Sequence, residues 1–115
     1  MTIDKTDIKT LDLGNDTTGE LLPIVHPGTI LQEEFLAPLE ITAYRLAKDI
    51  SVPPGRITTI LNGGRSITAD TALRLARYFG TSAQFWLNLQ SDYDLRTAER
   101  ELGDRLDKEV HPHAA

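Results

Sequence analysis

The stretch that decides the fold covers residues 43–60 and reads AYRLAKDISVPPGRITTI. Apolar residues recur at helical spacing on both sides of a short break, namely Leu46, Ala47 and Ile50 before it and Ile57, Ile60 and Leu61 after it. The break, Ser51-Val52-Pro53-Pro54, has the composition of a tight turn. The sequence therefore predicts two short helices that cross at a steep angle through this turn.

Local signals mark the ends of both helices. Thr42 is a good N-cap for the first helix, which we expect over residues 42–50, and Asn62-Gly63-Gly64 ends the second. Ala47 supplies the small side chain that fits where the helices cross. Ser51 occupies the turn position where a left-handed backbone is needed and Gly is usual. If Ser51 is left-handed, we expect roughly 1 kcal/mol of strain there.

Three further helices flank this pair, so the predicted fold class is all-α with five helices. Pro27 suits a first helical turn, and Pro38 is expected to end that helix after Ala37. Thr68 caps a helix that runs to Phe79, and Ser82 starts the next one. We expect the last helix to pack into the core through Phe85, Trp86, Leu89 and Tyr93.

The two ends of the chain differ from the middle. Residues 1–23 are rich in Thr, Asp and Gly without an apolar period, which predicts a flexible N-terminal segment. Residues 24–96 form the predicted helix-turn-helix domain, and residues 97–115 form a helical extension and tail. A second apolar stripe, which favours a partner-binding face over a frayed tail, comprises Leu95, Ala98, Leu102 and Leu106. Gly103 weakens the helix there by about 1 kcal/mol relative to Ala.

The net charge of −5 is unevenly distributed. Residues 1–40 carry two Lys against eight Asp or Glu, and residues 81–115 carry four basic against seven acidic side chains. Residues 41–80 carry six Lys or Arg, opposed only by Asp49 and Asp70. A basic middle between acidic ends favours a module that faces phosphates, although an uneven distribution by chance gives the same counts.

A helix-turn-helix presents the N-terminal part of its second helix to the major groove of DNA. We therefore predict a five-helix, repressor-like DNA-binding domain in which Arg56, Thr58, Thr59 and Asn62 read bases. The phosphate contacts are assigned to Thr42, Arg45, Arg65, Ser66 and Thr68. Pro54-Gly55 stands where long polar side chains often read bases, which places more weight on Arg56 and on DNA shape.

Other functions find less support in the sequence. Two helices joined by a turn also occur in bundles that touch no DNA. Adjacent helix residues point apart, so Glu33-Glu34 is unsuited to paired acid–base chemistry. His26 has no nucleophile constellation beside it, and His111 and His113 make a weak metal site without a third ligand. We predict neither an enzyme, nor a cofactor, nor a metal site.

The chain resembles the HigA-type antitoxins, the virulence-associated protein I group of Cro/repressor-like, XRE-family helix-turn-helix proteins. The resemblance covers residues 26–96. It rests on His26-Pro27-Gly28, on Leu31 to Leu39, on Ile60-Leu61-Asn62-Gly63 and on Ser66 to Leu75. Its most distinctive part is Phe79-Gly80-Thr81-Ser82-Ala83-Gln84-Phe85-Trp86-Leu87-Asn88-Leu89-Gln90 with Tyr93-Asp94-Leu95.

This resemblance implies a homodimer that represses its own operon at a palindromic operator. It also implies neutralisation of a HigB-type, RelE-like toxin that cleaves messenger RNA. Candidate residues for the dimer or partner interface are Trp86, Leu87, Tyr93, Leu95, Leu102 and Leu106. Acidic segments suit a basic nuclease, so we expect residues 1–23 or 97–110 to dock on the toxin.

Two alternatives remain open: a helix-turn-helix regulator without a toxin, and a protein-interaction module. Cysteine is absent and no apolar run approaches the roughly 18 residues of a membrane span. The N-terminus does not read as a secretory signal. A cytoplasmic location is the expectation.

Overall fold

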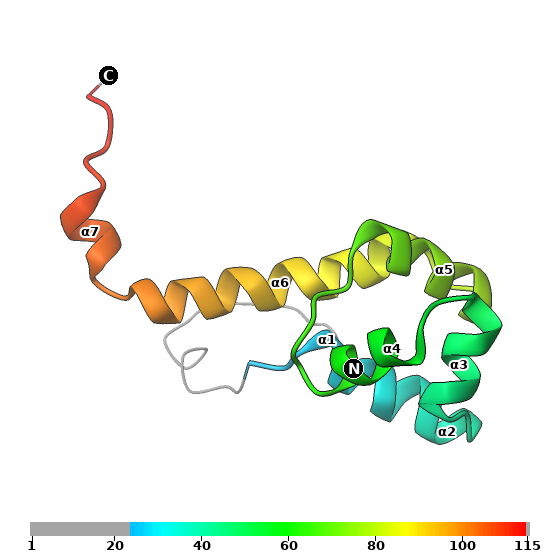
Figure 1. The fold of residues 1–115 in the computed structure, drawn as a ribbon. Coiled ribbons are helices and arrows are strands. Elements are labelled where there is room, and N and C mark those ends of the chain that lie inside the picture. Colours follow the sequence, from blue (N-terminus) through cyan, green and yellow to red (C-terminus); the bar gives the residue numbers. More distant parts are fainter. Residues whose placement is uncertain (1–23, 115) are drawn as a thin grey trace, which may run out of the picture.

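The computed structural model describes residues 24–114, and all of the regular structure there is helical. The prediction of a flexible segment over residues 1–23 lies outside the described residues. Helices α1 to α5 and the first part of α6 form a packed body, and the rest of α6 projects from it toward α7 (Figure 1). Within residues 24–114, no helix is both long enough and apolar enough to cross a membrane.

The first helical stretch is longer than predicted. It consists of α1 (Pro27–Ile30), a π-helical segment η2 (Leu31–Leu36) and α2 (Ala37–Leu39), so Pro38 lies inside it and does not end it. In η2 the backbone N–H of Ala37 reaches back five residues to the carbonyl of Gln32. This wider turn accommodates the proline ring, which in a regular α-helix would clash with the carbonyl four residues earlier. Glu40 then ends the stretch with a left-handed φ of 56°.

The helix-turn-helix pair forms as predicted. Helix α3 spans Ala43–Ile50, and α4 spans Pro54–Leu61. The Oγ1 of Thr42 accepts a hydrogen bond of 3.0 Å from the backbone N–H of Arg45 and so caps α3. Ser51 has φ 61° and ψ 50°, which confirms the left-handed turn position expected from the sequence.

The start of α1 lies against the end of α4. A Cβ on Gly28 would clash with the backbone carbonyl of Ile60, so only glycine permits this approach. The side chain of His26 caps α1, because its Nδ1 accepts a 2.9 Å hydrogen bond from the N–H of Gly28. Its ring meets that of Tyr93 edge-on, with centroids 4.7 Å apart. The start of α1 therefore contacts both α4 and Tyr93.

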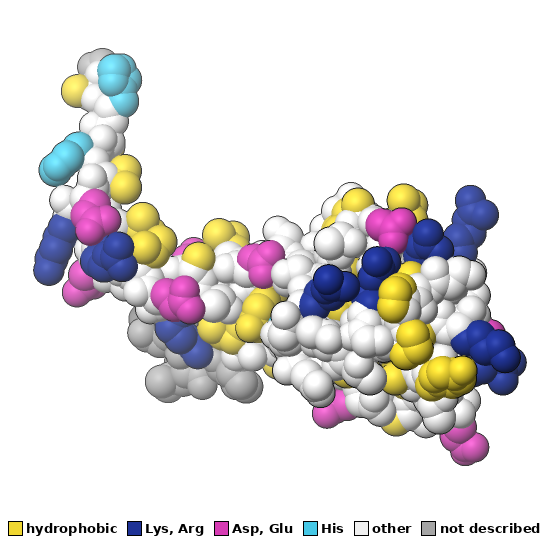
Figure 2. All heavy atoms as spheres, viewed as in Figure 1, with side chains coloured by type: hydrophobic (Ala, Val, Ile, Leu, Met, Phe, Trp, Pro, Cys, Tyr) yellow, Lys and Arg dark blue, Asp and Glu magenta, His cyan; other side chains and the backbone are white. Residues whose placement is uncertain are grey.

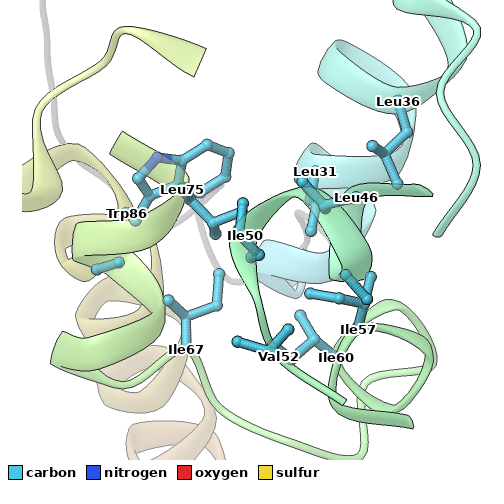
Figure 3. Close-up of a cluster of buried hydrophobic side chains, with 12 residues drawn as sticks. Leu31, Leu36, Leu46, Ile50, Val52, Ile57, Ile60, Ile67, Leu75 and Trp86 are labelled. Carbon is cyan, nitrogen blue, oxygen red and sulfur yellow. The ribbon is translucent and has the colours of Figure 1, made fainter. Parts of the chain in front are cut away.

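The hydrophobic core lies between the helix-turn-helix pair and the two helices that follow. These are α5 (Ala69–Phe79), capped by Thr68 and Gly80, and α6 (Ala83–Leu102), capped by Ser82. Side chains from these helices, from η2 and from the segments that join the helices converge in Figure 3: Leu31, Leu36, Leu46, Ile50, Val52, Ile57, Ile60, Ile67, Leu75 and Trp86. Trp86 is fully buried, and its Nε1–H donates to Thr81 Oγ1 at 2.7 Å.

The predicted apolar stripe beyond Tyr93 is interrupted. Helix α6 continues without a break past residue 96 and ends at Leu102, where Gly103 adopts φ 52°. Leu106 lies on a separate short helix, α7 (Arg105–Glu109), which leaves α6 at a clear angle in Figure 1. The prediction of one stripe from Leu95 to Leu106 was therefore wrong, because Gly103 ends the helix that would have carried it.

Candidate nucleic-acid interface

The outer face of α4 presents short polar side chains. Thr58, Thr59 and Asn62 are exposed. The Oγ1 of Thr59 donates to the carbonyl of Gly55 at 2.6 Å, and that of Thr58 lies 3.2 Å from the same oxygen. Because both hydroxyl protons point back into the helix, these side chains offer methyl groups and lone pairs outward. Such groups suit contact with thymine methyl groups and with base-edge donors.

Arg56 differs from its neighbours on α4. Its side chain is only 30% exposed, and its Nη1 lies 3.2 Å from Oδ2 of Asp70 on α5. The same carboxylate oxygen lies 3.1 Å from Nε of Arg74. The expectation that Arg56 points freely outward is therefore not met, because it has an acidic partner fourteen residues away in sequence.

A second carboxylate lies beside another predicted DNA contact. Asp49 Oδ2 lies 2.8 Å from Nε of Arg45 and accepts a 2.9 Å hydrogen bond from the hydroxyl of Tyr78. The bond from Arg45, followed by that from Tyr78, lowers the pKa of Asp49. The bond to Asp49 raises the pKa of Tyr78. Arg45 itself remains 68% exposed, so it can still approach a phosphate.

The sequence interpretation noted Asp49 and Asp70 only as the two acids of the basic segment. In the structure, each is bonded to an arginine that had been assigned to DNA. The sequence signal for these ion pairs was a carboxylate in an otherwise basic stretch. The i, i+4 spacing of Arg45 and Asp49 is typical of an ion pair on a helix and could have predicted that contact. The partner of Asp70 could not be predicted from sequence spacing.

The loop between α4 and α5 extends this surface. Arg65 and Ser66 are exposed, and within residues 24–114 Arg65 makes no ion pair. Gly63 needs its positive φ of 81°, and Gly64 packs closely on the methyl group of Thr59. At the end of the loop the Oγ1 of Thr68 accepts from the N–H of Thr71 at 3.5 Å. The loop therefore places polar groups next to the C-terminal end of α4.

The surface charges follow the arrangement of the helices. Lys and Arg side chains gather over the helical body in Figure 2, whereas along α6 and α7 they are mixed with Asp and Glu. All six basic residues of segment 41–80 are exposed at least in part and belong to α3, α4, the following loop and α5: Arg45, Lys48, Arg56, Arg65, Arg74 and Arg77. Within residues 24–114, no three His, Cys, Asp or Glu side chains converge as a metal site would require.

The predicted interface residues fall into three groups. Trp86 is a correction: it is fully buried in the core, so its large ring packs within one chain. Leu87, Tyr93 and Leu102 are half-buried, and Tyr93 is already covered in part by His26. Leu95 and Leu106 are 61% and 43% exposed. An open groove along α6 is lined by Gln84, Leu87, Asn88, Gln90, Ser91, Asp94, Leu95 and Ala98.

Comparison with known proteins places this arrangement in a family. Residues 33–86 match the family model described as "Helix-turn-helix". Virulence-associated protein I of Dichelobacter nodosus is 55% identical over 80 residues, which is 70% of this chain and 74% of that protein. A solved addiction-module antidote protein of the HigA family from Coxiella burnetii is 51% identical, with a TM-score of 0.76 over 80% of this chain and 100% of that one. The chain belongs to the HigA family of helix-turn-helix proteins.

HigA-family membership confirms the resemblance and the all-helical repressor-like fold. It also supports the prediction that the chain is not an enzyme. A further solved relative is the antitoxin HigA of Pseudomonas aeruginosa, determined with the higBA promoter. It is 43% identical, with a TM-score of 0.77 over 80% of this chain and 100% of that one.

Proposed function

We propose that the chain is a DNA-binding antitoxin that represses its own operon and neutralises a small RelE-like toxin that cleaves messenger RNA. The observation that carries the proposal is the exposed polar face of α4, set in a helix-turn-helix and flanked by exposed arginines. The solved HigA antitoxin of Pseudomonas aeruginosa, with its promoter DNA, supports the DNA-binding half. An antitoxin that represses its own operon must reach that DNA, so the proposal includes a cytoplasmic location.

The DNA contacts divide by the chemistry of the side chains. Short polar groups face the base edges in the major groove, from Thr58, Thr59 and Asn62. The guanidinium of Arg56 can donate two hydrogen bonds to one guanine. The surrounding groups fix the register on phosphates: Thr42, Arg45, Arg65, Ser66 and Thr68. Because the base readers are short, DNA shape contributes a large part of the discrimination.

The outer face of α6 is the proposed dimer surface. Leu87, Leu95 and Ala98 line its open groove. Leu95 is a large apolar side chain that is exposed and does not belong to the core. A two-fold dimer would place two copies of α4 about one DNA turn apart, which matches a palindromic operator. Residues 24–96 serve as the DNA-binding unit, and residues 97–115 extend beyond it with Leu102 and Leu106.

The toxin is the second proposed partner. A nuclease that holds RNA phosphates needs a basic active site, and the acidic segments of this chain, residues 1–23 and 97–110, complement such a surface. Removing each segment is expected to weaken toxin binding for at least one of the two truncated chains. Unchanged toxin affinity in both would contradict the docking proposal and leave the DNA-binding proposal intact.

Co-expression tests the antitoxin proposal. The full chain is produced together with the product of the neighbouring short open reading frame, and growth and co-purification are scored. Restored growth and a stable complex are expected. A chain that selects a specific DNA sequence but neither restores growth nor co-purifies would instead be a stand-alone regulator. Relatives of the chain include proteins named as HTH-type transcriptional regulators.

A further inference from the structure

The loop between α4 and α5 is held by a side chain of α6. The backbone N–H of Ile67 donates to Oε1 of Gln90 at 2.7 Å, across 23 residues of sequence. In the described part of the chain, Arg65, Ser66 and Ile67 make no other hydrogen bond. Three of the proposed phosphate contacts, here called the loop contacts, flank Ile67 directly: Arg65, Ser66 and Thr68. The position of Ile67 therefore affects where all three lie.

This hydrogen bond is buried at both ends. Gln90 is 6% exposed and Ile67 is 2% exposed. Among residues 24–114, Thr71 is the only other polar residue in the buried class. Burying an amide or a backbone N–H is costly unless it finds a partner, and here each supplies the partner of the other. If Gln90 lost its acceptor, the N–H of Ile67 would have to move to find another one.

Asp94 determines which end of the Gln90 amide faces the loop. Nε2 of Gln90 donates to Oδ1 of Asp94 at 2.9 Å. A carboxylate only accepts hydrogen bonds, so the NH₂ group must face Asp94 and the amide oxygen must face the N–H of Ile67. A flipped amide would set two donors against each other at Ile67 and two acceptors against each other at Asp94. The hydrogen bonds therefore run in one direction, from the loop through Gln90 to the surface of α6.

Resting on the proposed DNA-binding function, we propose that Gln90 is a positioning residue for DNA binding: oriented by Asp94, it holds Ile67 so that the loop contacts reach phosphates. Gln90 is buried, so it acts through the loop and not by touching DNA. Phosphate contacts set register and affinity but carry no sequence information. Loss of Gln90 therefore weakens binding to every duplex alike.

The proposal is tested with Gln90→Leu in the full-length chain, which removes both hydrogen bonds and keeps the net charge. The probes are a duplex that the wild-type chain selects from a randomised pool, and a random duplex of equal length. Affinity for both is expected to fall by about tenfold, with a log–log salt dependence shallower by about one phosphate contact. The ratio of the two affinities is expected to stay the same, and amide hydrogen exchange at Ile67 is expected to become faster.

An isosteric exchange provides the rescue. In Gln90→Glu, two carboxylates face each other at Asp94, so the side chain is expected to turn away from Ile67 and DNA binding to weaken. In Gln90→Glu/Asp94→Asn, the new amide donates to the new carboxylate, which can again accept from Ile67. This double variant also has the net charge of the wild-type chain. It is expected to regain the wild-type affinity, salt dependence and exchange rate.

Two controls separate positioning from folding and from dimer formation, with all chains measured below their thermal midpoints. Thr81→Val removes the acceptor of the buried Nε1–H of Trp86, which lowers stability without touching the loop. It is expected to keep the wild-type DNA affinity. Leu95→Asp changes the α6 groove but neither Gln90 nor Asp94. It is expected to keep the slow exchange of Ile67.

Three results would overturn the inference. They are wild-type DNA affinity in Gln90→Leu, equal losses of affinity in Gln90→Leu and Thr81→Val, and a double variant that binds no better than Gln90→Glu. A wild-type chain whose binding to DNA does not depend on salt would overturn the proposed DNA-binding function itself, a result distinct from these three.

Discussion

Ser51 adopts φ 61° and ψ 50° with a Cβ that disfavours this region. The backbone there is fixed by its surroundings, since the N–H of Val52 donates to the carbonyl of Ala47 at 3.0 Å and Arg74 bonds the carbonyl of Ile50. The helix-turn-helix therefore keeps its geometry despite the unfavourable residue. Because the strain is confined to Ser51, a substitution at this residue is expected to change the free energy of unfolding.

Ser51→Gly is expected to raise the free energy of unfolding by about 0.5–1 kcal/mol, because relief of the left-handed strain exceeds the entropy that glycine adds to the unfolded chain. Urea denaturation measures the change. Ser51→Ala is the control and should give no such gain, since it keeps the Cβ. A glycine variant less stable than the alanine variant would contradict this account of the turn.

His26 makes the stability of the domain depend on pH. Burial lowers its pKa from the usual 6.5, and the charge of Asp94 offsets part of this effect. The folded state therefore prefers the neutral imidazole, whose Nδ1 accepts the capping bond from Gly28. The contribution of His26 to the free energy of unfolding is fully present above pH 6.5. This contribution is lost as the pH falls through the lowered pKa of His26 in the folded chain.

Thermal unfolding across the pH range measures this dependence. His26→Asn retains a capping acceptor without a group that titrates in this window. The wild-type chain is expected to lose more stability than this variant below pH 6.5. Parallel pH profiles for the two chains would show that the cap does not respond to protonation.

At the scale of the elements, local signals predicted most helix boundaries. Thr42, Thr68 and Ser82 each cap a helix at the expected position, because capping depends on neighbours within one turn. The passage of the first helix through Pro38 was missed, since a π-helical turn carries no simple sequence signal. The pairing of Arg56 with Asp70 was missed because it depends on how α4 and α5 pack.

The junction of α1 and α4 gives a prediction of its own. Gly28→Ala is expected to lower the free energy of unfolding by about 3 kcal/mol, because its Cβ would collide with the backbone of Ile60 and Leu61. Gly55→Ala is the matched control, since a Cβ there meets nothing within 4 Å. Chemical denaturation of both variants measures the difference. Equal stabilities would mean that α1 can shift away from α4 at little cost.

At the scale of the whole molecule, the projecting part of α6 and the break at Gly103 were only partly predictable. Composition indicated an extension beyond the domain, but whether the helix continued past Gly103 depended on a backbone angle that no local pattern specifies. The result is that Leu95 and Leu106 lie on different helices. The proposed dimer surface is therefore centred on α6 and its groove.

Leu95→Asp is expected to shift the chain from dimer to monomer in sedimentation-velocity measurements, because a charge on the proposed dimer face must be desolvated on association. Leu73→Asp is the control. Leu73 is similarly exposed, at 60% against 61%, but lies on α5. A dimer that survives Leu95→Asp and dissociates with Leu73→Asp would move the interface from α6 to α5.

The central claim is that this chain recognises a specific DNA sequence through α4. The most direct measurement is a fluorescence-anisotropy titration of the full chain on its selected duplex and on random DNA, over a range of salt concentrations. The account predicts at least about 10³-fold tighter binding to the selected duplex, and a steep loss of affinity with salt on both. Equal affinity for the two duplexes, or binding that does not change with salt, would contradict it.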